Sequence, residues 1–370
     1  MHRGLMSAPI RLVFVLPSEG GGGGANSVVQ EALGFQRIGI STVIASPSGK
    51  HTRLAVNYPE LLEGGVRVAP FESEEDLGSL LGQVDICCAT TNQSVELIHR
   101  AIGGLPSDAE VPRCAYYVQD YEPLFYEYGS SEWRVASDSY KKINNCIMFA
   151  KTKWICDIVY MNHGVRVERV EPSIDHSIFY PNFRDGDSQR IVVSAMLRPK
   201  TPRRAPLRTA RTLGWIAATF PKARIDIFGA SDAELVDQSI EVPENAVNHG
   251  RLKRTGVPEI LRRSDLFLDL SDYQAFGRTA LEAMASGSVP VVPLFGGADE
   301  YANHGVNSFV VDTRSDSEIR NAIRAFLEMS QSEREAMRIN AIETASRYSV
   351  TRAVASELKV FTRALSATGA

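Results

Sequence analysis

Strand-like and helix-like segments alternate along this chain, and this alternation restricts the fold more than any other feature. Residues 11–16 form a short apolar run, a glycine-rich loop follows, residues 25–38 show a helical pattern, and residues 42–45 form a second strand-like run. A strand, a helix and a strand in this order indicate a parallel sheet covered by helices. The chain is therefore predicted to be an α/β protein.

The alternation comes in two series separated by a polar, turn-rich segment at residues 172–190. Further strand-like runs of the first series are 66–69, 84–89 and 113–118, and residues 154–170 read as a helix followed by a strand. Strand-like runs of the second series are 191–195, 224–228, 266–270, 289–292 and 308–311, with helical patterns at 204–219, 257–263 and from 317 onward. A length of 370 residues suits two domains. We expect one domain at 1–180, a second at 181–350 and a C-terminal helix within 351–370.

Composition excludes several classes of protein. A hydrophobic content of 44% and a charged content of 23% are ordinary for a soluble globular protein. A net charge of −4 argues against nucleic-acid binding, and neither a run of 18 apolar residues nor a signal-peptide core is present. The five cysteines include no C-x-x-C pair and no histidine partner at zinc spacing. A reduced, cytoplasmic location without a metal site is the expectation.

A turn followed by a helix at residues 271–292 is the most informative segment for function. Gly277 allows a close backbone approach, and the helix that begins behind it offers free N–H groups and a positive dipole end to a phosphate. Glu282 lies about one and a half turns further on, within reach of a sugar hydroxyl. The candidate donor-binding residues here are Gln274, Phe276, Gly277, Arg278, Thr279 and Glu282. The alternative is an ordinary amphipathic helix.

A basic loop follows the strand predicted at 191–195. It carries four cations in seven residues, namely Arg198, Lys200, Arg203 and Arg204. Charge-assisted contacts to a diphosphate are worth about 1.5–3 kcal/mol each. These side chains are candidate donor-binding residues, and a solvated basic turn is the alternative.

The glycine run at 20–24 lies between the first strand and the first helix. It lacks the acidic ribose partner of a dinucleotide-binding fingerprint, since residues 40–46 hold none, and it lacks the lysine of a P-loop. Glycines nevertheless let backbone approach a ligand closely, so Gly22 and Gly23 are candidate donor contacts. A flexible surface loop is the alternative.

Polar residues follow the strand predicted at 113–118. Gln119, Asp120, Tyr121 and Glu122 come at its carboxyl end, where substrate groups collect in open α/β sheets. They are the candidate acceptor-binding residues, and Asp120 is the best candidate for holding or deprotonating an acceptor hydroxyl. The alternative is a loop with ordinary capping acids and core aromatics.

A basic stretch in the first domain contains Lys141, Lys142, Lys151, Lys153 and Trp154. One interpretation is that these residues contact an anionic membrane peripherally. A solvated helix face is the other interpretation of these residues.

The 271–292 segment resembles the nucleotide-sugar site of GT-B glycosyltransferases of glycosyltransferase family 4. It keeps that pattern at Ser271, at Phe276 and Gly277, from Glu282 to Ala285, and at Gly287 and Pro290. Gln274 stands where the family usually has a glutamate, or just beside it. The R-P-x-T-P-R-R run at 198–204 and the Y-V-Q-D-Y-E-P run at 117–123 resemble a rhamnosyltransferase subgroup.

This resemblance implies a GT-B fold, with two Rossmann-like domains, an interdomain cleft and a last helix that packs back on the first domain. It implies transfer of a sugar, with dTDP-rhamnose as the best single donor, to a saccharide or lipid-linked saccharide, with retention of configuration. Arg198 and Lys200 would be catalytic by stabilising the leaving diphosphate, and no metal or cofactor would be required. A location in the cytoplasm, either free or at the inner face of the membrane, fits this function. A sugar-nucleotide epimerase of the same fold and a non-catalytic nucleotide-sugar-binding module are the alternatives.

Overall fold

The computed structural model describes residues 10–182 and 190–366 of the chain. The chain divides into two compact units, the first made of Met1–Ser173 together with Val350–Ala370 and the second of Ile174–Ser349. The first boundary lies close to the one expected after residue 180. The segment 183–189 of the predicted linker lies outside the described residues.

The N-terminal unit is built on a seven-stranded sheet in which every strand pair is parallel. In spatial order its strands are β3 (Arg67–Phe71), β2 (Ser41–Pro47), β1 (Arg11–Val15), β4 (Ile86–Ala89), β5 (Arg113–Tyr117), β6 (Ile147–Ala150) and β7 (Glu168–Arg169). The strand order reverses between β1 and β4. In open parallel sheets, ligands bind outside the carboxyl ends of the strands at such a switch point.

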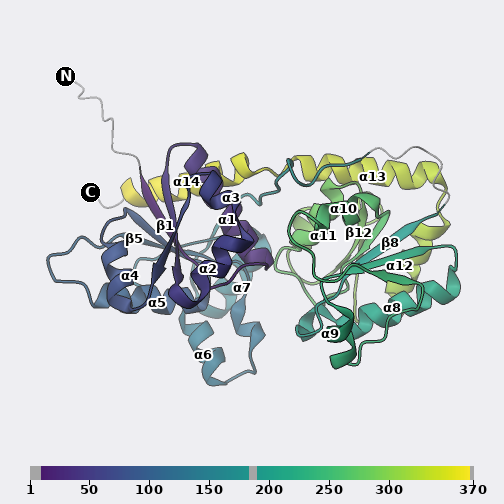
Figure 1. Ribbon diagram of the computed structural model, residues 1–370, viewed down its shortest axis with the longest axis horizontal. Helices are drawn as coiled ribbons and strands as arrows, with labels where there is room; N and C mark the ends of the chain where they lie inside the picture. Colours follow the sequence, from purple (N-terminus) through teal and green to yellow (C-terminus); the bar gives the residue numbers. More distant parts are fainter. Residues whose placement is uncertain (1–9, 183–189, 367–370) are drawn as a thin grey trace. The chain divides into compact units, whose positions relative to one another are not determined.

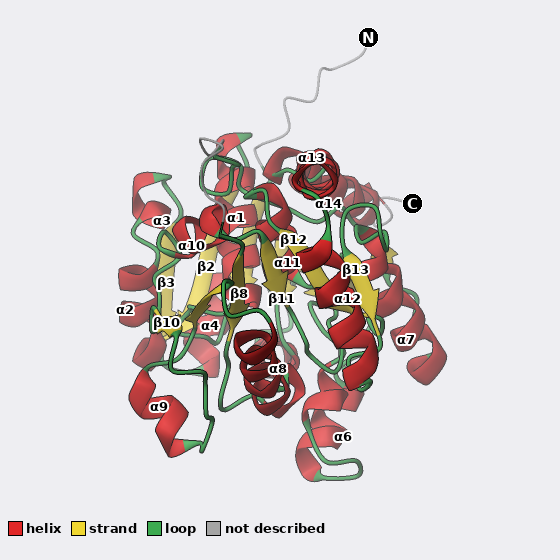
Figure 2. Ribbon diagram, turned by 90° about the vertical axis from the view of Figure 1, so that its right-hand side faces the viewer, coloured by secondary structure: helices red, strands yellow, loops and turns green. Residues whose placement is uncertain are grey.

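Helices pack around this sheet (Figure 1), and Figure 2 shows the strands of the two sheets in yellow and the helices in red. They are α1 (Gly23–Arg37), α2 (Ser48–Asn57), α3 (Glu60–Glu63), α4 (Glu74–Leu81), α5 (Asn92–Gly103), the 3₁₀ turn η1 (Glu122–Phe125), α6 (Ser131–Asp138) and α7 (Lys153–His163). Local sequence explains where several of them begin, because Ser73 and Thr91 each form a capping box with the third helical residue.

The C-terminal helix α14 (Val350–Ser366) completes the core of this first unit. Phe361 on α14 stacks on Phe35 of α1 at 5.7 Å and meets Phe149 of β6 edge-on at 5.5 Å. Gly34 allows the close approach of the two helices, since a Cβ there would lie 2.6 Å from a Val354 methyl. Helix α14 therefore packs on the N-terminal unit, as the family resemblance implies.

The C-terminal unit has a six-stranded parallel sheet. In spatial order its strands are β10 (Ala246–Asn248), β9 (Arg224–Phe228), β8 (Val192–Met196), β11 (Leu266–Leu268), β12 (Val289–Pro293) and β13 (Phe309–Val311). Its helices are the 3₁₀ turn η2 (Pro202–Arg204), α8 (Pro206–Thr219), α9 (Asp232–Asp237), α10 (Val257–Arg263), α11 (Arg278–Ala285), the 3₁₀ turn η3 (Ala298–Glu300), α12 (Asp316–Glu328) and α13 (Gln331–Ser346). One apolar cluster packs around Leu213 and Ile323, and another packs around Leu261 and Met284.

The alternation read from the sequence is confirmed. Strand β9 and helix α10 have the bounds that the sequence predicts, and the other predicted elements lie within a few residues of theirs. Two strands, β6 and β10, are not among the predicted ones. β6 lies inside the basic stretch, between Lys142 and Lys151, and β10 is only three residues long.

Candidate functional site

The loop between β8 and α8 gathers cations at the carboxyl edge of the C-terminal sheet. Arg198 is half-buried, and its side chain makes no hydrogen bond or ion pair with the described residues. Burial lowers the pKa of Arg198, and the nearby Arg204 and Arg251 lower it further. Lys200, two residues on, is exposed. An anion would stabilise a half-buried guanidinium that has two arginines nearby and no carboxylate partner among the described residues.

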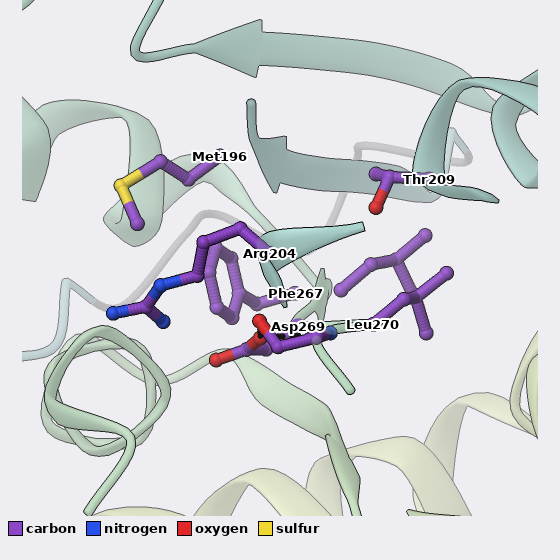
Figure 3. A pocket seen from close by; sticks show the side chains of 8 residues that line it. Met196, Arg204, Thr209, Phe267, Asp269 and Leu270 are labelled. Atoms are coloured by element: carbon purple, nitrogen blue, oxygen red, sulfur yellow. Dashed lines mark hydrogen bonds between the residues drawn. The ribbon is translucent and has the colours of Figure 1, made fainter. Parts of the chain in front are cut away.

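The other two cations of this loop are partly engaged within the unit. The Arg203 carbonyl accepts a hydrogen bond from the Asp272 N–H at 2.8 Å, and its guanidinium lies 5.4 Å from the centre of the Tyr273 ring. Arg204 lines a cavity of about 10 Å³, together with Phe267 and Asp269 (Figure 3). That volume holds about one water molecule, so a donor would bind across this edge and not inside the cavity.

Asp269, directly after β11, organises the loop that leads to Gly277. Its carboxylate accepts hydrogen bonds from the Ser271 hydroxyl at 2.5 Å and from the Gln274 amide at 2.6 Å. The same Gln274 nitrogen donates to the Ser271 hydroxyl oxygen at 3.1 Å. Because a carboxylate only accepts, it fixes the orientation of the Gln274 amide and leaves the amide oxygen as its remaining hydrogen-bonding group.

The backbone of Gln274 is held by the turn that follows β12. Its N–H donates to the Phe295 carbonyl at 3.2 Å, and its carbonyl accepts from the Gly297 N–H at 2.8 Å. Gly296 between them has a φ of 115°, and a Cβ there would lie 1.9 Å from the Gln274 carbonyl oxygen. Only glycine fits at position 296, and the turn that contains it holds the backbone of the candidate donor residue Gln274 in place.

Gly277 opens helix α11 in a left-handed conformation, with a φ of 83°. Its carbonyl accepts a hydrogen bond from the Tyr301 hydroxyl at 3.0 Å, and a Cβ at this position would lie 2.4 Å from that oxygen. No side chain caps α11. Phe276 and Thr279 flank the turn, both half-buried, and Phe276 meets the Tyr301 ring edge-on at 5.6 Å. The start of α11 thus has the tight turn and the uncapped N-terminus that the sequence predicts.

Glu282 is almost fully buried and is paired one turn back with Arg278, at 2.8 Å between Nε and Oε1. Burial raises the pKa of Glu282, and the nearby Arg278 and Arg254 oppose this rise. Arg254 in turn pairs with Asp175 at 3.3 Å. A sugar hydroxyl that binds the carboxylate of Glu282 would therefore share this carboxylate with Arg278.

In the N-terminal unit, the glycine loop and the segment after β5 lie next to each other. A Cβ on Gly24 would lie 3.2 Å from the Gln119 amide oxygen, whereas Gly22 and Gly23 have open space around their missing Cβ positions. The Gly21 N–H donates to the Tyr58 hydroxyl at 3.0 Å, which orders the loop before helix α1. The space at Gly22 and Gly23 is compatible with a ligand at this edge.

The four candidate acceptor residues differ in what their side chains contact. Gln119 donates to the Thr90 carbonyl at 3.2 Å, and the half-buried Asp120 accepts from the Tyr121 N–H at 2.9 Å. The Tyr121 hydroxyl lies 3.0 Å from His163 Nε2, and its ring stacks on Tyr140 at 5.8 Å.

Glu122, the last of these four residues, is buried. Its carboxylate accepts from the Asn92 N–H at 2.5 Å, at the start of α5. Burial raises its pKa to about 8. Tyr121 and Glu122 are thus already engaged in contacts within the unit, and their part in acceptor binding stays a prediction.

Sequence reasoning missed several residues that shape this region. Arg208 on α8 donates to the Leu270 carbonyl at 2.9 Å and pairs with Asp272 at 2.8 Å. Asp269 and Tyr301 were also overlooked. An acid directly after a buried parallel strand was the signal available for Asp269, whereas Tyr301 and Arg208 reach the loop only through the tertiary fold.

One part of the proposed basic surface is wrong. Lys151 is buried and pairs with Glu31 of α1, because it follows β6 and points into the unit. Lys142 pairs with Glu96 at 3.1 Å, and Lys153 pairs with Asp157 on its own helix.

Residues 10–182 and 190–366 contain no cluster of three or more histidine, cysteine or acidic side chains arranged to hold a metal ion. Among the helices described, none combines the length and apolar character needed to cross a bilayer.

Comparisons with known proteins agree on the fold. Residues 212–344 match the family model of glycosyl transferases group 1. The curated mannosylfructose-phosphate synthase of Agrobacterium fabrum is 35% identical over 75 residues, which cover 20% of this chain and 16% of that protein.

Solved structures are similar over nearly the whole chain. Anabaena Alr3699/HepE, in complex with UDP and glucose, has a TM-score of 0.74 at 17% identity, covering 95% of this chain and 99% of that one. The sucrose-phosphate synthase of Thermosynechococcus elongatus has a TM-score of 0.74 at 13% identity, covering 97% and 100%. These similarities and the two parallel sheets confirm the predicted fold, GT-B with two Rossmann-like domains.

Proposed function

We propose that this protein is a glycosyltransferase that moves a sugar from a nucleoside diphosphate donor to a saccharide or a lipid-linked saccharide. The main support is Arg198, a half-buried guanidinium that has Arg204 and Arg251 nearby and no carboxylate partner among the described residues. A diphosphate supplies the negative charge that this position lacks. Solved proteins of the same fold bind UDP and UDP-glucose.

The same cations would act on the reaction as well as on binding. Negative charge grows on the diphosphate as the glycosidic bond breaks, so Arg198 and Lys200 would stabilise the transition state more than the bound donor. The uncapped start of α11 at Gly277 would add backbone N–H groups beside the phosphates. With this charge available, we propose that transfer requires neither a metal nor a cofactor.

Rhamnose from dTDP-rhamnose is the donor sugar that we propose, with retention of configuration, as in the family 4 rhamnosyltransferases. The support is the amino-acid sequence of two segments, 117–123 and 198–204, which lie at the carboxyl edges of the two sheets. Gln274 presents a neutral amide where those enzymes usually have an acid. Donor choice is therefore tested with both dTDP-linked and UDP-linked sugars.

Asp120 is the acceptor residue that we propose. It is half-buried at the carboxyl edge of the N-terminal sheet, beside Gln119 and the glycine loop. A carboxylate there can orient a sugar hydroxyl and take its proton.

Calorimetric titration with UDP, dTDP and GDP, and with their monophosphates, tests the donor site. We expect Arg198→Ala to weaken diphosphate binding by about ten- to a hundredfold, corresponding to about 1.5–3 kcal/mol, and to weaken monophosphate binding less. Arg211→Ala removes an exposed arginine of α8 and is the matched control. Absence of diphosphate binding by the wild type, or equal losses for both classes of ligand, would contradict the proposal.

A further inference from the structure

The surface formed by residues 124–133 carries exposed aromatic rings on the N-terminal unit. Tyr128 is 84% exposed and Phe125 is 41% exposed, and Tyr126 and Trp133 are half-buried beside them. Leu124 adds an exposed aliphatic side chain. Such a concentration of exposed rings in ten residues is typical of a binding surface.

These rings are held in place. Ser130 accepts the Trp133 N–H at 3.0 Å and caps α6, and Gly129 turns the chain before it with a φ of 81°. The Tyr128 ring meets Trp133 edge-on at 4.7 Å. A preordered aromatic surface loses little conformational entropy when a ligand binds.

The 124–133 surface continues from the edge proposed for the acceptor. The chain passes from β5 through Asp120 directly into η1, which is tied to the start of α5 by the Glu122 carboxylate. The loop after η1 and helix α6 then project from the unit (Figure 1). A ligand whose reacting end lies at Asp120 can therefore extend over these rings.

Charge selects the class of ligand. From residue 124 to residue 138 the chain has three acidic residues and one basic residue, Arg134, and Glu127 and Glu132 are exposed among the rings. This surface repels an anionic membrane or a polynucleotide. Rings that can cover the C–H face of a sugar, next to carboxylates that accept hydrogen bonds from hydroxyl groups, suit a neutral saccharide.

We propose that the 124–133 surface is a subsite for a neutral oligosaccharide, which holds the acceptor chain beyond its reacting sugar. This inference rests on the proposed function and adds to it the chemical class of the acceptor. The buried rings of Tyr117 and Tyr121 stack inside the unit, on Phe149 and Tyr140, and so do not form this subsite.

An array of neutral gluco-, galacto-, manno- and rhamno-oligosaccharides tests the subsite, with the full-length protein applied together with saturating UDP or dTDP. We expect Tyr128→Ala and Phe125→Ala to weaken binding to the array at least tenfold. Tyr160→Ala removes a 55%-exposed tyrosine of α7 and should change nothing. Tyr128 is so exposed that its truncation is expected to leave the fold intact.

Three outcomes would overturn the subsite. They are no array binding by the wild type, equal losses for Tyr128→Ala and Tyr160→Ala, and binding to phosphatidylglycerol vesicles that depends on Tyr128. Nucleotide titration of the same samples separates this failure from failure of the proposed function. If the protein binds nucleotide but no oligosaccharide on the array, only the subsite is refuted. If the protein does not bind nucleotide, the proposed donor site is refuted.

Discussion

Replacing Glu122 by glutamine should make the N-terminal unit more stable at neutral pH and remove part of its pH dependence. Two effects compete at this carboxyl group. The hydrogen bond from the Asn92 N–H at the start of α5 favours the ionised form, whereas burial and the neighbouring Asp120 favour the neutral form. Burial is the stronger effect and raises the pKa of Glu122 from 4.5 to about 8.

The sign and size of the effect follow from proton binding. Between pH 4.5 and about 8 the folded unit keeps a proton on Glu122 that the unfolded chain has lost. Stability therefore falls as pH rises through this window, at about 1.4 kcal/mol per pH unit. From pH 5.5 to pH 7.5 the wild type should lose about 2–3 kcal/mol relative to Glu122→Gln, which cannot ionise.

Urea unfolding followed by tryptophan fluorescence measures this difference. A Trp215→Phe background leaves Trp133 and Trp154, both in the N-terminal unit, so that the signal reports this unit alone. Glu127→Gln, an exposed change on the same segment, is the control. If Glu122→Gln is less stable than the wild type with an unchanged pH slope, the carboxyl group is ionised and the helix start outweighs burial.

Three further predictions concern the two sites and the core of the N-terminal unit. Glu282→Gln should weaken UDP or dTDP binding by about tenfold or more in calorimetry, because the charged acceptor of a ribose hydroxyl is lost, and unchanged affinity would remove Glu282 from the donor site. If Asp120 is the base that deprotonates the acceptor, Asp120→Asn should leave donor affinity unchanged and lower transfer by ~10²–10⁴-fold in a product assay. Reduced donor affinity with normal transfer per bound donor would instead assign Asp120 to the donor site. Lys151→Met should destabilise the N-terminal unit by about 3–5 kcal/mol in urea, because Glu31 keeps its buried charge without a cation, and a loss below about 1 kcal/mol would show that the pair is not ionised.

The fold and the position of the candidate donor loops were accessible from the sequence because they depend on local patterns. Alternating apolar runs predict parallel strands, and Gly277 before a helical pattern predicts a turn with a helix start behind it. The basic residues of the 198–204 loop became candidates because they closely follow a strand, and ligands bind outside the carboxyl ends of strands in open parallel sheets.

The direction of individual side chains was not accessible in the same way. Lys151 lies in a basic stretch, but it follows a buried strand and points to Glu31, which is 120 residues away in the chain. Gln274 departs from the family pattern, and only the fold shows that its amide is turned onto Asp269. Such partners are chosen by tertiary packing and leave no periodic signal in the sequence.

The return of α14 to the first unit has a consequence for how this protein is made. The second unit, Ile174–Ser349, is continuous in sequence, and in topology it is an insertion into the first. During synthesis the ribosome releases the whole of this inserted unit before Val354 and Phe361, which fill the core of the unit that began first. The N-terminal unit is therefore the last to become complete. A fragment ending at Ser173 would expose the apolar face that α14 covers, whereas the inserted unit has all of its own core within one stretch of chain.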